Sequence, residues 1–61
     1  MNPTKQKFKK GDLVVSTWHN LLGTITEIDR SGEFWVYLIE QKSNKTRIWV
    51  FETDLRIVNA S

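Results

Sequence analysis

The stretch from Gly11 to Ile28, GDLVVSTWHNLLGTITEI, constrains the fold of this chain more than any other part of the sequence. Residues 13–15, LVV, are apolar and partly β-branched, and such side chains suit a pleated, half-buried backbone. The Gly-Asp pair at 11–12 is a turn signal that precedes them. We therefore predict a strand that starts near Leu13, a compact loop, and a second strand that must bend.

The bend is indicated by the spacing of Leu22, Ile25 and Ile28. A spacing of three fits neither strict strand alternation nor a helix that carries Gly23 at its start. One extra residue near positions 26–27, a β-bulge, would let Ile25 and Ile28 point to the same side and would raise the local twist. We expect Gly23 to open this strand, where its missing side chain permits close backbone approach or a positive φ.

These motifs resemble a known fold. The pattern G-D-x-V at residues 11–14, followed by G-x-I-x-x-I at residues 23–28, resembles the opening of KOW-type and other SH3-like small β-barrels. The pattern W-x-F-E-x-D-L-x-x-V at residues 49–58 is similar to the segment that closes such barrels. The resemblance covers residues 8–58, and it implies an all-β, SH3-like small barrel of five short antiparallel strands with a one-turn 3-10 helix before the last strand. The chain also resembles small accessory proteins of bacteria and phages.

The expected organisation is a flexible basic leader at residues 1–7, a barrel at 8–58 and a frayed C-terminus at 59–61. Runs rich in β-forming residues, separated by turn signals, place the strands near residues 12–17, 23–30, 34–41, 46–51 and 55–58. The apolar positions expected in the core are Val14, Ile25, Ile28, Leu38 or its neighbour Tyr37, Trp49 and Leu55. Phe8 is expected to plug one end of the barrel.

A chain of 61 residues without cysteine has no disulfide and no thiolate metal site, so its three Trp, three Phe and one Tyr must supply much of the apolar burial. The first ten residues are polar and basic, which does not fit a signal peptide, and no apolar run approaches a membrane span. We expect a cytoplasmic protein with no membrane association.

The run FWVYLI at residues 34–39 is apolar on both faces. Trp35, Tyr37 and Ile39 share one face, and we favour this set as the inward one. Phe34, Val36 and Leu38 would then form an exposed apolar strip. A strip of this kind on a small domain indicates contact with another protein or self-association.

The loop at residues 17–21 offers a second candidate site, because it combines Trp18, His19 and an amide. Trp18 is interpreted either as a partner contact or as a cover over the barrel mouth, and the cover is favoured. His19 lacks a second histidine or a carboxylate at ligand spacing, so a metal role is not expected. Scattered acids and the absence of a glycine-rich phosphate motif predict no enzyme, no cofactor and no small-molecule substrate.

Charge separates the two function classes that remain. Residues 1–10 carry four lysines and no acid, whereas residues 11–61 carry five basic and seven acidic side chains, a net −2. A nucleic-acid-binding domain usually shows its basic face on the folded body. We therefore favour a protein-interaction or structural module, with Trp18, His19, Phe34, Val36 and Trp49 as partner-binding residues. The alternative is an RNA- or DNA-binding module whose cationic residues are Lys5, Lys7, Lys9, Lys10 and Arg47.

Overall fold

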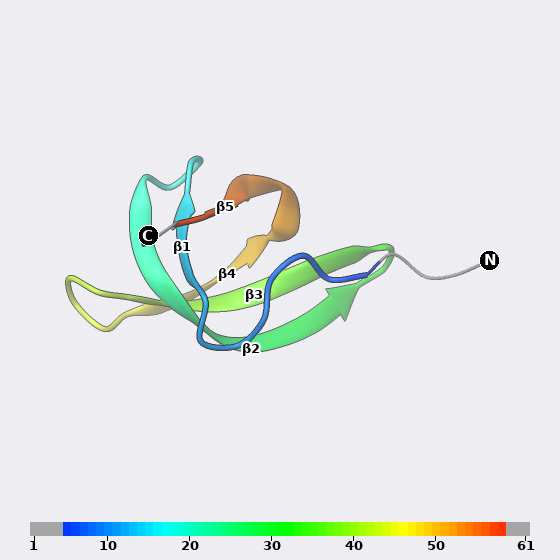
Figure 1. The fold of residues 1–61 in the computed structure, drawn as a ribbon, viewed down its shortest axis with the longest axis horizontal. Helices are drawn as coiled ribbons and strands as arrows, with labels where there is room; N and C mark the ends of the chain where they lie inside the picture. Colours follow the sequence, from blue (N-terminus) through cyan, green and yellow to red (C-terminus); the bar gives the residue numbers. More distant parts are fainter. Residues whose placement is uncertain (1–4, 59–61) are drawn as a thin grey trace.

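The computed structural model describes residues 5–58, which form one antiparallel sheet of five strands (Figure 1). The elements in chain order are β1 Leu13–Ser16, β2 Leu21–Ser31, β3 Phe34–Gln41, β4 Arg47–Phe51, the 3-10 turn η1 Glu52–Asp54 and β5 Leu55–Ile57. The all-β class, the five strands and the single 3-10 turn before the last strand are confirmed. The leader and the C-terminal tail predicted at 1–7 and 59–61 lie partly or wholly outside the described residues.

The strand order is β4-β3-β2-β1-β5, so β4 and β5 are the two edges of the sheet. Over residues 5–58 they do not pair with each other, and the closed barrel expected from the sequence is not confirmed. The bent β2 joins the two halves of the sheet, since residues 21–24 pair with β1 and residues 23–31 pair with β3. Figure 1 shows this strand curving around one side of the molecule. The sheet is therefore strongly coiled but open.

The predicted bulge lies where the sequence placed it. Ile25 pairs with Ile39 and Glu27 pairs with Leu38, so Thr26 is the additional residue. Its hydroxyl donates a hydrogen bond to the Leu38 carbonyl at 3.2 Å. The extra residue turns both Ile25 and Ile28 toward the core, as the spacing of three required.

Gly23 lies within β2, two residues after its start, and its role is close backbone approach. A Cβ atom at this position would lie 2.5 Å from the Glu40 carbonyl oxygen and 2.5 Å from Cγ2 of Ile39. The positive-φ glycines of the described chain are Gly11 and Gly32 instead. Gly32 has φ +63° and opens the two-residue turn between the paired Ser31 and Phe34, as a type II′ hairpin turn requires.

The buried apolar side chains form a single cluster. They are Phe8, Val14, Ile25, Tyr37, Ile39, Val50 and Leu55. This confirms Val14, Ile25, Tyr37 and Leu55 as core residues, while Ile28 packs against the cluster from a half-buried position. The favoured inward face of β3 is also confirmed, with Tyr37 and Ile39 fully buried and Trp35 half-buried.

Trp49 was expected in the core, and this prediction is wrong. Its side chain is 51% exposed, whereas the neighbouring Val50 is 3% exposed. The physical reason is the register of β4 on β3: Val50 pairs with the inward-facing Tyr37, and Trp49 pairs with Leu38 on the other face. Residues directly opposite each other in an antiparallel pair share a face, so burying Tyr37 forces Trp49 outward.

The N-terminal segment completes the core, as predicted for Phe8. Figure 1 shows this segment, in dark blue, running past β3 before it turns into β1. The Phe8 ring meets the Tyr37 ring edge to face, with 5.4 Å between centroids, and the Phe8 amide donates to the Tyr37 hydroxyl at 3.4 Å. That hydroxyl donates to Oε2 of Glu52 at 2.6 Å, and the same oxygen accepts the Lys7 amide at 2.8 Å. Tyr37 and Glu52 therefore tie the N-terminal segment and η1 to β3.

This network predicts a pH dependence of stability. Burial, followed by the hydrogen bond to Glu52, raises the pKa of Tyr37 from 10.0 to about 12. The folded state thus holds the phenol proton more tightly than the unfolded chain. The corresponding stability is complete below about pH 10 and is lost as the pH rises toward 12, by roughly 2 to 3 kcal/mol at most.

We expect Tyr37→Phe to lower the free energy of unfolding near neutral pH by about 1 to 3 kcal/mol, because it removes the acceptor of the Phe8 amide and one of the two donors to Oε2 of Glu52. Urea titrations at several pH values between 9 and 12 test this. The two proteins share every other ionisable group, so the difference between wild type and variant isolates Tyr37. That difference should shrink across pH 10 to 12, and a constant difference would contradict the assignment.

Candidate protein-contact surface

The outward face of β3 and β4 carries one apolar surface, which we call the outer strip. Cross-strand pairing places Val36 opposite Phe51 and Leu38 opposite Trp49, and Phe34 continues the same face of β3. The members of the outer strip are Phe34, Val36, Leu38, Trp49 and Phe51. Two neighbouring strands are thus apolar on a face that the core does not use.

The aromatic members of the outer strip are the most accessible. Phe34 is 57% exposed, Trp49 51% and Phe51 47%, while Val36 and Leu38 are half-buried beneath them. The rings of Phe34 and Phe51 meet edge to face, with centroids 5.9 Å apart. Together with Thr53 they line a small hollow of about 200 Å³. An apolar partner side chain could enter this hollow without moving the core.

Charged side chains border the outer strip. On β2, Glu27 lies opposite Leu38 and Asp29 lies opposite Val36. Beyond Leu38 and Trp49 the next pair is Glu40 and Arg47, which form an ion pair with 3.4 Å between Nε and Oε1. The arrangement is an apolar centre with a charged rim, which is typical of protein contact surfaces.

The sequence identified only part of this surface. Phe34 and Val36 lie on it as predicted partner-binding residues, and so does Trp49, which the sequence also assigned to the core. Leu38 was predicted on the exposed strip but not named as a partner-binding residue, and Phe51 was not predicted on this surface. The signal for Phe51 was its alternation with Trp49, which places both side chains on one face once β4 is assigned.

The loop after β1 is separate from the core. Trp18 is 78% exposed, so the favoured interpretation of Trp18 as a cover over the barrel mouth is wrong. Phe8 supplies the peripheral aromatic ring of the core instead. The Thr17 amide donates to the Asp54 carbonyl at 3.0 Å, and the His19 amide donates to Oγ of the buried Ser16 at 3.2 Å. These bonds fix the base of the loop against η1 and leave the Trp18 and His19 side chains exposed.

The predicted cationic residues do not form one basic face. Lys5, Lys7 and Lys9 are exposed in the N-terminal segment. Lys10 lies 3.7 Å from Oε1 of Glu27, and Arg47 is paired with Glu40. Lys10 and Arg47 therefore each face a carboxylate.

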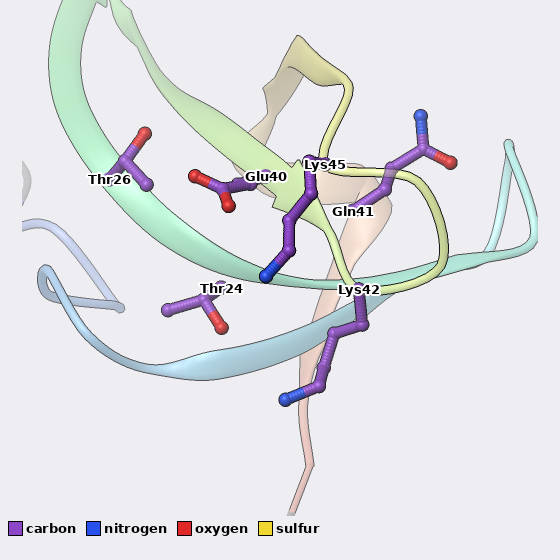
Figure 2. A pocket seen from close by; sticks show the side chains of 6 residues that line it. All are labelled: Thr24, Thr26, Glu40, Gln41, Lys42 and Lys45. Carbon is purple, nitrogen blue, oxygen red and sulfur yellow. The ribbon is translucent and has the colours of Figure 1, made fainter.

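A polar hollow of about 220 Å³ lies near the β3–β4 loop. Its lining residues are Thr24, Thr26, Glu40, Gln41, Lys42 and Lys45. Figure 2 shows the Lys45 side chain extending across this hollow between Glu40 and Thr24. Mixed charges and an open rim give this hollow no preference for an anion or a cation.

Residues 5–58 contain no group of three or more His, Asp or Glu side chains that could hold a metal ion. They also contain no helix that is long and apolar enough to cross a membrane. Comparison of the chain with models of protein families, with curated proteins and with solved structures gives no match.

Proposed function

We propose that this chain is a small, non-enzymatic interaction module that binds another protein through the outer strip. The observation that carries the proposal is the exposure of three aromatic rings beside two half-buried aliphatic side chains on one face of β3 and β4. A domain of this size has little apolar area to spare, since small domains bury a modest fraction of their surface on folding. Aromatic side chains left outside the core in a contiguous patch favour a contact role.

We also propose an SH3-like architecture for the module. The bulged second strand, the 3-10 turn directly before β5 and the order β4-β3-β2-β1-β5 support the resemblance seen in the G-D-x-V and G-x-I-x-x-I motifs. SH3-like folds host several unrelated functions, so the choice of protein as partner rests on the surface and not on the fold.

The charge distribution favours a protein over a nucleic acid. Asp29 lies on the β2 side of the outer strip, where its carboxylate would repel a phosphate backbone that stacked its bases on Trp49 or Phe34. Arg47 and Lys10 each face an acid. A partner with an apolar centre and basic flanks complements this rim.

The test is capture from nuclease-treated native lysate on the immobilised chain. Phe34→Lys places a charge at the most exposed position of the outer strip on β3, and Val36→Lys places one at its centre. We expect both to reduce capture of the wild-type partner at least about tenfold, because a charge must be desolvated against an apolar contact. Leu22→Lys is the matched control, since Leu22 is 42% exposed but lies outside the outer strip. Equal capture by Phe34→Lys and Leu22→Lys would contradict the proposal.

The salt dependence of the binding affinity distinguishes the proposed protein contact from the nucleic-acid alternative. Binding through Lys5, Lys7, Lys9 and Lys10 should give a slope of log affinity against log salt of roughly −3, at about −0.7 per contact to a single strand. Replacing these four lysines by glutamine tests this without removing Phe8, which belongs to the core. We expect partner capture to survive that replacement and to depend weakly on salt. A steep, lysine-dependent affinity for RNA or DNA would replace the proposed function with the alternative.

A further inference from the structure

The outer edge of β4 presents unused main-chain groups. The Gln41 amide donates to the Thr46 carbonyl at 2.8 Å, so residues 41 and 46 stand at a hydrogen-bonding position of the β3–β4 ladder. Hydrogen-bonded and non-hydrogen-bonded pairs alternate along an antiparallel ladder. The main chains of Ile48 and Val50 therefore bond to β3, and those of the alternate residues, Arg47, Trp49 and Phe51, point away from it. Arg47 and Trp49 face no other strand on this side of the sheet, whereas Phe51 is the N-cap of η1 and its carbonyl accepts the first hydrogen bond of that turn.

This edge lacks the features that usually protect an exposed strand. The β4 sequence RIWVF contains no proline and no lysine, and its register on β3 has no bulge. The opposite edge of the sheet, β5, is only three residues long. The β4 edge is therefore the better template for another strand.

The charges along β4 favour a strand of the same sequence. The strand begins with basic residues, Lys45 just before it and Arg47 at its first position, and it runs directly into the acidic turn that holds Glu52 and Asp54. Two copies of β4 in antiparallel orientation bring the basic start of each against the acidic end of the other. A parallel copy would align like charges.

We propose that two copies of this chain pair through the outer edges of their β4 strands, antiparallel and related by a two-fold axis at Trp49. In this register Arg47 of each copy lies opposite Phe51 of the second copy, and the two Trp49 residues face each other. The outward main-chain groups then form about four hydrogen bonds across the axis, since the Phe51 carbonyls remain bonded within η1. The pairing is isologous, so it closes at two copies.

The pairing would also enlarge the contact surface. Directly opposed residues of an antiparallel pair lie on the same face, so the two outer strips would join into one apolar surface across a ten-stranded sheet. Trp49 would lie at the centre of this surface instead of at its border. Main-chain hydrogen bonds at the β4 edge hold the dimer together. Dimerisation therefore does not depend on whether the outer strip binds another protein.

The first measurement is sedimentation of the full chain over a range of concentrations. We expect a monomer–dimer equilibrium with no larger species. A clean monomer at high concentration would overturn the pairing. An open-ended or ring-sized assembly would also overturn it, because such assemblies require a head-to-tail contact that includes β5.

The second measurement locates the interface by charge complementation. Arg47→Glu places an acid against the acidic turn of the second copy, and Thr53→Lys places a base near Arg47 of the second copy; both positions are exposed in the monomer. Each variant alone should dimerise at least about tenfold more weakly than wild type. A mixture of the two variants should form a heterodimer, since the altered charges then attract. Arg56→Glu is the matched control, because it makes the same charge change on β5 and should leave dimerisation unchanged.

A chain made by chemical synthesis with an N-methyl group on the Trp49 amide provides an independent test. It keeps every side chain and removes one outward donor that the fold does not use. We expect it to fold and to lose dimerisation. A dimer that survives both N-methylation and Arg47→Glu would overturn β4 pairing, and a dimer abolished by Arg56→Glu would assign the interface to β5. Phe34→Lys should leave the dimer intact even where it abolishes partner capture, so failure of the two proposals is distinguishable.

Discussion

Ile25→Ala is expected to leave much of the chain unfolded at room temperature. Ile25 is 1% exposed, lies beside the bulge and packs in the single apolar cluster. Truncating a buried isoleucine to alanine costs about 2 to 5 kcal/mol, because both the transfer free energy and the packing of its neighbours are lost. A domain of this size without disulfides or metals has a total stability of roughly 3 to 5 kcal/mol.

Ile57→Ala is the matched control for this measurement. It removes the same atoms from a side chain that is 52% exposed, so we expect a change of about 0.5 kcal/mol or less. Thermal and urea unfolding, followed by circular dichroism, compare the two. Equal melting temperatures for both variants would show that the bulge does not direct Ile25 into the core.

Gly23→Ala is the second change with a large expected effect. The added Cβ would lie 2.5 Å from the Glu40 carbonyl oxygen and 2.5 Å from Cγ2 of Ile39, and a main-chain oxygen in a paired strand cannot rotate away. The variant must separate β2 from β3 locally, next to the core. Overpacking of this kind costs about 1 to 3 kcal/mol, and the main-chain contact places Gly23 in the upper part of that range or above it.

Gly32→Ala separates steric exclusion from backbone conformation. Nothing lies within 4 Å of a Cβ at Gly32, but its φ of +63° is unfavourable for alanine. That conformation costs roughly 1 to 2 kcal/mol for a residue with a side chain. We therefore expect Gly23→Ala to lower the free energy of unfolding more than Gly32→Ala. The reverse order in denaturant titrations would contradict the close approach of β2 and β3 at Gly23.

The outer strip consists of the same kinds of side chain as the core. Phe34, Trp49 and Phe51 are as apolar as the buried residues, and their exposure brings no gain in folding free energy. Their placement on one face of two adjacent strands, one of which is a sheet edge, makes both face and edge available to other chains. A binding role for the face and a pairing role for the edge are separate consequences of this arrangement.

The local features of this protein were determined by the sequence itself. β-branched and aromatic runs between turn signals located all five strands to within two residues of their observed limits. The spacing of Leu22, Ile25 and Ile28 located the bulge, because a period of three in a strand has no other simple geometric solution. The position of Gly23 in a strand indicated close backbone approach or a positive φ, and the structure shows the close approach.

Only the tertiary structure decided between the two faces of β4. Ile48 and Val50 alternate with Trp49 and Phe51, and all four are apolar, so periodicity alone gives both faces equal weight. The register of β4 on β3 decides between the two faces, because it places Val50 opposite the inward-facing Tyr37. The choice depends on a pairing between distant residues, which no local pattern in β4 encodes.

The exposure of Trp18 and the position of β4 at the edge of the sheet were also decided by the tertiary structure. Whether a loop aromatic covers the core depends on how the chain packs, and Phe8 from the N-terminal segment packs on Tyr37 while Trp18 stays exposed. Whether β4 is an edge depends on its distance from β5 in the coiled sheet, which the bend of β2 sets. A sequence pattern indicates whether a residue prefers a buried or an exposed position. Whether the residue finds such a position depends on how other parts of the chain pack around it.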